Sequence, residues 1–203
     1  MAISAQDKIL YVANKLGLST LKDMQGSTGA VYDVDTENSG VIFGNAGKHR
    51  NPGLTNLNDN KFEVNEALLI ETISFFAGGG ISNNEATNLS FYTTSSEVIL
   101  FDLIIGNKVV MKDTPVFAAG MPETFASEGV QVDIGGSTAV RVPRHQVYLE
   151  GAGILIPPQV EWSINYKMYN MITGTVVALT DEFYHIGAYL FGTRVLLNFN
   201  TSI

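Results

Sequence analysis

The sequence predicts an all-β protein, an antiparallel β-sandwich of jelly-roll type with a short N-terminal helix. From residue 62 onward, about ten short segments rich in β-branched and aromatic residues alternate with Gly, Pro, Asn and Asp. Helical patterns between these segments are missing, which argues against a parallel α/β sheet. A chain of 203 residues that is 45% hydrophobic can bury one core. We therefore expect a helical arm at residues 1–29 and a single sandwich domain at residues 30–203.

The N-terminal helix is expected over residues 4–16. Ser4 can cap it, and Gly17 supplies a C-terminal stop. One face carries apolar residues at helical spacing, namely Ala5, Ile9, Val12 and Leu16. Such a helix can pack on its own sandwich, or it can be an arm that docks on a neighbouring subunit. If it is an arm, a protein that lacks residues 1–25 should fold but fail to assemble.

Residues 17–61 are rich in Gly, Asn and Asp and contain two short strand candidates, Ala30–Val34 and Gly40–Phe43. A long loop-rich segment in a compact domain often forms an interface. Phe62–Phe76 carries both a strand period and a helical period, and the β-rich surroundings favour a strand.

The rest of the chain alternates strand and turn. The expected strands are Leu89–Thr93, Glu97–Ile105, Lys108–Met111, Val130–Ile134, Thr138–Val142, Gln146–Ile156, Val160–Tyr169, Thr175–Leu179, Tyr184–Phe191 and Thr193–Phe199. The sequence Ile105-Gly-Asn-Lys108 predicts a hairpin, because Gly and Asn tolerate the positive φ of a two-residue turn. Gly135-Gly136 predicts a second hairpin. Pro157-Pro158 belongs in a turn or at a sheet edge, since proline cannot donate to a ladder.

The composition restricts the possible partners. The net charge of −8 argues against direct contact with nucleic acid, which needs clustered Lys and Arg. Charged residues are only 16% of the chain, against roughly 25% in typical soluble proteins, and a surface with so little charge favours a homo-oligomer. The chain has no cysteine, no basic-then-apolar signal sequence and no apolar run that could span a membrane.

Two possible metal sites have simpler explanations. The three histidines, His49, His145 and His185, are far apart in sequence, unlike the His-x-His pair of a cupin. The segment from Asp33 to Gly40 resembles the start of a calcium loop. Its sixth position is Asn38 and its twelfth is Gly44, so the Gly and the closing Glu are missing. We interpret this segment as a turn with acidic residues on the surface, and we expect no metal and no cofactor.

Other candidate chemistry is equally weak, so an enzyme is not expected. Four acidic residues near strand ends, Glu150, Glu161, Asp181 and Glu182, could form a glycosidase pair, but nothing marks two of them as opposed. Trp162 and Tyr166 share a strand face with Ile164, and Tyr169 lies on the opposite face. This pattern favours core packing over a sugar-stacking platform.

Three segments carry a resemblance to known proteins: Asp102–Met111, Val147–Gln159 and Tyr189–Val195. Their Gly-Asn hairpin, their strand ending in Ile-Pro-Pro and their final Gly-x-Arg strand pair resemble jelly-roll virion proteins of bacteriophages. The resemblance covers roughly the last hundred residues and implies a capsid or capsid-associated subunit without an active site. The nearly neutral, helical N-terminus differs from the basic arm with which small capsids contact their genome.

We therefore expect a virion structural protein that acts by self-assembly and by contacts with other virion proteins. Its location would be the virion, as capsid or decoration. The alternative is a carbohydrate-binding β-sandwich module of an adhesin or receptor-binding protein.

Overall fold

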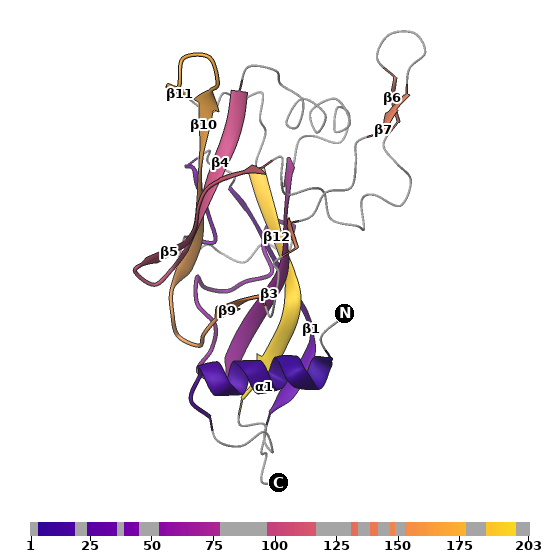
Figure 1. Cartoon of the computed structure of the whole chain (residues 1–203), viewed down its shortest axis with the longest axis vertical. Coiled ribbons are helices and arrows are strands. Elements are labelled where there is room, and N and C mark those ends of the chain that lie inside the picture. Colours follow the sequence, from indigo (N-terminus) through magenta and orange to yellow (C-terminus); the bar gives the residue numbers. More distant parts are fainter. Residues whose placement is uncertain are drawn as a thin grey trace.

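In the residues that it describes, the computed structural model contains one helix, two five-stranded antiparallel sheets and one two-stranded antiparallel sheet (Figure 1). It describes residues 4–18, 24–35, 39–44, 53–77, 97–116, 131–133, 139–141, 147–148, 153–177 and 186–197. The elements are α1 (Ala5–Lys15), β1 (Gln25–Asp35), β2 (Val41–Ile42), β3 (Glu66–Ala77), β4 (Glu97–Ile105), β5 (Lys108–Pro115), β6 (Gln131–Asp133), β7 (Ala139–Arg141), β8 (Val147–Tyr148), β9 (Ile154–Ile156), β10 (Trp162–Asn170), β11 (Val176–Val177) and β12 (Ile186–Leu196).

The two sheets have different strand orders. The first sheet runs β1-β12-β3, and both β8 and β9 pair with the far edge of β3. The second sheet runs β11-β10-β4-β5, and β2 joins it along β10. All of these pairs are antiparallel. Strands β6 and β7 form a separate antiparallel pair, as expected for the segments on either side of Gly135-Gly136.

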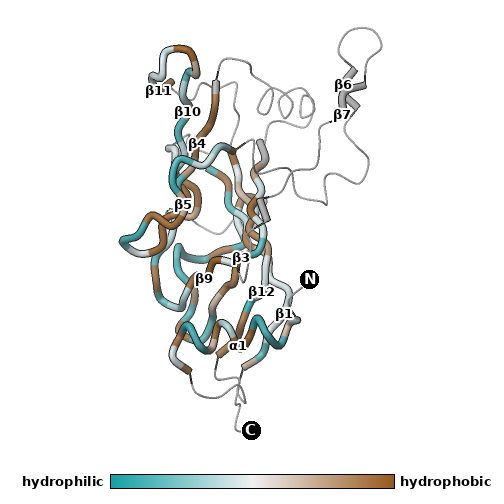
Figure 2. The backbone as a smooth tube through the Cα atoms, in the orientation of Figure 1, coloured by the Kyte–Doolittle hydropathy of each residue, from teal (hydrophilic) through white to brown (hydrophobic). Residues whose placement is uncertain are grey.

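One hydrophobic core joins the two sheets. It contains inward-facing residues of β1, β3 and β12 from the first sheet and of β4 and β10 from the second. Phe75 of β3 meets Phe101 of β4 with ring centroids 4.7 Å apart. In Figure 2 the hydrophobic colour runs along β3 and β4, as expected for strands in the middle of a buried layer.

The helix packs on its own chain. It begins at the expected cap, where the Ser4 hydroxyl accepts a hydrogen bond from the Asp7 N–H at 3.2 Å. Its buried face, centred on Val12, contacts the outer side of the first sheet at Leu69 and Val195. Figure 1 shows α1 lying across β1, β12 and β3. Of the two interpretations of the helix, the structure therefore agrees with the one in which it packs on its own chain.

An ion pair fixes the position of the helix on the sheet. The Lys8 ammonium lies 2.7 Å from one carboxylate oxygen of Glu71, and the Thr193 hydroxyl donates to the other at 2.7 Å. Lys8 is on the helix, Glu71 on β3 and Thr193 on β12, so one partly buried carboxylate connects three elements.

Several sequence predictions agree with the structure. β4 has the predicted bounds, and β5 starts at the predicted Lys108 after a two-residue turn in which Gly106 has a φ of +57°. The ambiguous segment Phe62–Phe76 contains a strand, β3. The predicted strand Leu89–Thr93 lies outside the described residues.

Two predictions at the C-terminal end of the chain are wrong. Tyr184–Phe191 and Thr193–Phe199 were expected as separate strands, but β12 is one strand that runs through Gly192. The ladder to β3 shifts register between Phe191 and Gly192, and a Cβ at Gly192 would collide with the Leu69 carbonyl. The extra residue of this β-bulge is Glu71 on β3, and Gly192 lets the continuous strand β12 pass close to the Leu69 carbonyl.

The predicted strand Gln146–Ile156 is interrupted. Of its described residues, 147–148 form β8 and 154–156 form β9, both paired with β3, and Gly153 belongs to neither strand. Gly153, just before β9, has a φ of +91° and lies against the Ile70 carbonyl. An extended strand cannot continue through that conformation.

Candidate functional site

A buried carboxylate lies at the end of β1, where the first sheet meets the second. Asp35 is fully buried. Its Oδ2 accepts hydrogen bonds from the Gly40 N–H at 2.8 Å, the Ser39 hydroxyl at 3.1 Å and the Val41 N–H at 3.3 Å. The Tyr166 hydroxyl donates to the same oxygen at 2.8 Å. Asp35 thereby holds the turn before β2 and ties β1 to β10.

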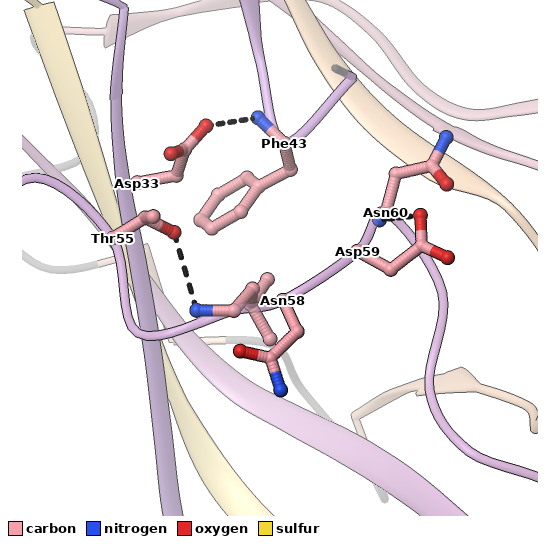
Figure 3. Close-up of a pocket in the computed structure, with 7 residues that line it drawn as sticks. Asp33, Phe43, Thr55, Asn58, Asp59 and Asn60 are labelled. Atoms are coloured by element: carbon pink, nitrogen blue, oxygen red, sulfur yellow. Dashed lines mark hydrogen bonds between the residues drawn. The ribbon is translucent and has the colours of Figure 1, made fainter. Parts of the chain in front are cut away.

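Asp33, two residues earlier, plays a similar part for the next segment (Figure 3). Its side chain is 4% exposed, and its Oδ2 accepts the Phe43 N–H at 2.7 Å. A cavity of about 20 Å³ lies beside it, lined also by Thr55 and by residues 57–60. This volume has room for one water molecule.

The interpretation of Asp33 and Asp35 as surface acids is wrong, because both carboxylates are buried and accept backbone N–H groups. They satisfy loop amides that would otherwise lack partners. Among the described residues, no group of three or more His, Asp or Glu side chains is arranged to hold a metal ion.

The predicted core packing of the β10 aromatics is confirmed. Trp162 and Tyr166 are each 2% exposed, and Ile164 between them is fully buried. The indole of Trp162 packs between two phenyl rings, with centroids 4.4 Å from Phe43 and 6.0 Å from Phe62. These residues fill the core and are not available to bind a ligand.

Most other candidates lie outside the described residues. These are His49, His145, His185, Glu150, Asp181 and Glu182. Glu161 is among the described residues, and its side chain is exposed. It directly precedes β10, and its backbone carbonyl accepts the Gly106 N–H at 2.7 Å. Its role in the structure is therefore to join the β4–β5 turn to the start of β10 through its main chain.

The structure reveals an exposed apolar loop between β10 and β11 that sequence patterns did not single out. Ile172 is 84% exposed and Met171 is 55% exposed. The Asn170 side chain holds this loop by accepting the Ile172 and Thr173 N–H groups at 2.9 and 3.1 Å. Figure 2 shows the loop in the hydrophobic colour at one end of the molecule. A hydrogen-bonded turn thus presents two large apolar side chains to solvent.

The β4–β5 hairpin presents a second apolar element. Val109 and Val110 are 50% and 45% exposed. The register of β4 against β10 puts the β4–β5 turn beside Trp162 and the β10–β11 turn beyond Asn170. The two exposed apolar elements therefore belong to opposite ends of the second sheet.

A larger cavity of about 110 Å³ lies beside the edge strand β1. Its lining includes Gly29, Phe62 and Leu68, together with the ion pair between Arg194 and Glu66. Apolar and charged groups therefore meet at this edge of the first sheet.

Comparison with known proteins found no matching family model, no matching curated protein and no matching solved structure. Within the described residues, no helix is long and apolar enough to cross a membrane.

Proposed function

We propose that this chain is a structural subunit of a bacteriophage virion, a capsid or capsid-associated β-sandwich of jelly-roll type. It acts by self-association and by contacts with other virion proteins, and its place is the virion. The net charge of −8 supports a position without direct contact to the genome. The resemblance of three sequence segments to phage virion proteins supports the same class.

The observation that carries the proposal is the β10–β11 loop. Burying an exposed Ile or Met side chain stabilises an association by about 1.5–3 kcal/mol. A flexible loop would lose conformational entropy on binding, but hydrogen bonds to Asn170 already order this one. Exposed Met171 and Ile172 therefore suit a permanent contact with another subunit.

The first test is the molar mass of the purified protein by light scattering over a range of concentration. We expect a species larger than the 22.0 kDa chain, and a variant with Met171→Ser and Ile172→Ser should need a higher concentration to form it. Val64→Ser is the control, because Val64 is an isolated apolar residue that is 74% exposed. A monomer at every concentration would contradict the proposal. If Val64→Ser weakens association as much as the loop variant does, the loop has no specific role in it.

Assembly into a shell requires its own measurement. Negative-stain electron microscopy of the concentrated protein should show rings, sheets or closed particles. Small discrete oligomers without further growth would instead favour a decoration subunit.

The alternative function, a carbohydrate-binding module, has one supporting observation. Tyr32 of β1 lies directly opposite Tyr189 of β12, and Phe191, two residues further along β12, is 37% exposed. Alternation places these three rings on one face of the first sheet, where they could stack on sugar rings. Binding on a glycan array that is lost in Tyr189→Ala but kept in Tyr169→Ala would favour this alternative.

A further inference from the structure

Among the described residues, only part of the outer edge of β1 has hydrogen-bond partners from its own chain. The Asn56 amide accepts the Tyr32 N–H at 2.9 Å and donates to the Ala30 carbonyl at 2.8 Å. The Asn56 backbone N–H also donates to the Tyr32 carbonyl at 3.2 Å. One residue thus takes the place of a neighbouring strand along residues 30–32.

Toward the start of β1, the same edge has no hydrogen-bond partner among the described residues. Backbone groups alternate in direction along a strand, so Gly26 and Thr28 face the same side as Ala30 and Tyr32. Within the described part of the chain, the N–H and C=O groups of Gly26 and Thr28 have no hydrogen-bond partner on that side. These two residues present two donors and two acceptors.

β5, the edge strand of the second sheet, has features that block pairing with another strand. Two register irregularities interrupt its pairing with β4, and Asp113 has a φ of +48°. β5 also carries Lys108 and Lys112 and ends at Pro115. Bulges, lysines and proline are features with which proteins block edge-to-edge pairing. β1 has none of them over Gln25–Ala30, a segment without charge or proline.

We propose that a second copy of the chain pairs its β1 antiparallel with this open edge, about a two-fold axis at Ser27. The pairing matches Gly26 of each copy with Thr28 of the other, and their four donors and four acceptors make four hydrogen bonds. The proposal rests on the self-association proposed above and assigns it a second surface besides the β10–β11 loop. The two first sheets become one continuous sheet across the dimer.

The side chains at this edge permit such an approach. Two molecules that each carry a charge of −8 repel each other, and Gln25–Ala30 is a strand segment where no like charges meet. In the proposed register Gln25 of the second copy falls opposite Gly29. Gly29 has no side chain of its own, and the incoming Gln25 side chain would extend toward the 110 Å³ cavity that Gly29 and Arg194 line.

Disulfide trapping tests the register directly. Ser27 is exposed and would face its own copy as a non-hydrogen-bonded pair, with Cα atoms about 4.5 Å apart, within the range for a disulfide. The chain has no cysteine of its own. Mild oxidation of Ser27→Cys should give a linked dimer at twice the 22.0 kDa chain mass. The control Lys112→Cys, also exposed and on the edge strand β5, should stay largely unlinked at the same concentration.

A second pair of variants tests the hydrogen bonds. Thr28→Pro removes an outward N–H and leaves the ladder to β12 intact, whereas Thr28→Val keeps that N–H. Sedimentation equilibrium should show a dimer dissociation constant at least about tenfold higher for Thr28→Pro than for Thr28→Val, because each copy loses one donor.

The outcomes separate the edge from self-association itself. If the native protein associates, but Ser27→Cys links no better than the control and Thr28→Pro dimerises like Thr28→Val, the β1 edge is overturned and self-association stands. A native protein that stays monomeric overturns both. If Thr28→Pro unfolds, the disulfide result alone decides.

Discussion

Asp35 shows how much one residue contributes to the joint between the two sheets. Asp35→Ala leaves the buried Tyr166 hydroxyl and the Gly40 N–H without their acceptor. Because each unsatisfied buried group costs about 1–3 kcal/mol, we expect Asp35→Ala to lower the free energy of unfolding by about 3 kcal/mol or more. Tyr166→Phe removes only one donor and should cost about 1 kcal/mol. Denaturant unfolding measures both, and equal losses would show that the loop amides do not depend on Asp35.

The same pair predicts a stability change at alkaline pH. Burial, and next the hydrogen bond to Asp35, raise the pKa of Tyr166 far above its usual range. In the unfolded chain this hydroxyl ionises near pH 10, so above that pH the unfolded state binds fewer protons than the folded state. The stabilisation is complete below about pH 10 and is lost as the pH rises beyond it. The free energy of unfolding should fall less steeply between about pH 10 and 11.5 in Tyr166→Phe, and identical slopes would contradict this.

At this scale the sequence predicted the core aromatics but not the carboxylates. Trp162, Ile164 and Tyr166 alternate along a strand, and alternation is visible in sequence. Asp33 and Asp35 also alternate, but their burial depends on loop amides more than four residues away, which no local pattern specifies. A polar residue at a core position of a strand pattern is the one signal that could have indicated a buried anchor.

At the scale of elements, the packing of α1 changes what a truncation should do. Removal of residues 1–25 would uncover Leu69 and Val195, which are fully buried beneath the helix. The truncated protein should therefore lose stability and aggregate, instead of staying folded without assembling. The helix is part of the fold.

Point variants test this without truncation. Val12 is fully buried against the sheet, whereas Leu10 is 43% exposed on the same helix. We expect Val12→Ala to lower the free energy of unfolding by about 1–3 kcal/mol and Leu10→Ala to change it by less than about 0.5 kcal/mol. Thermal unfolding followed by circular dichroism can measure the difference. Similar effects of both variants would show that α1 does not stay docked in solution.

The ends of a strand were predictable where a local turn sets them. They were not predictable where pairing with a neighbouring strand sets them. The Gly106-Asn107 turn fixes the β4–β5 hairpin through its own backbone preference. Glycine is common in turns, which predicted a break at Gly192, but the strand continues because it pairs with β3 on both sides of this residue. β1 begins at Gln25, earlier than the expected Ala30, because β12 offers pairing partners to the weak strand formers before it.

At the scale of the whole molecule, the sequence predicted antiparallel β-structure with one helix, but not the surfaces on which the proposed function depends. The exposed loop at Ile172 and the open edge at Gly26 and Thr28 both depend on three-dimensional pairing. Whether a strand lies at the edge of a sheet depends on which strands pair with it. Whether an apolar residue is exposed depends on which other residues pack over it. Composition indicated self-association, and only the structure shows candidate contacts.

The charge of the molecule leads to a prediction about salt. Each copy carries −8, and the proposed contacts at the β1 edge and the β10–β11 loop are uncharged, so electrostatic repulsion opposes association at low ionic strength. Screening shortens the range of this repulsion to about 10 Å at 0.1 M salt. The dissociation constant from sedimentation equilibrium should therefore fall a few-fold between about 20 and 300 mM NaCl. Glu161→Gln neutralises an exposed carboxylate, so it should tighten association at low salt and change it little at high salt. If added salt instead weakens association of the native protein, opposite charges hold the interface together and the prediction is contradicted.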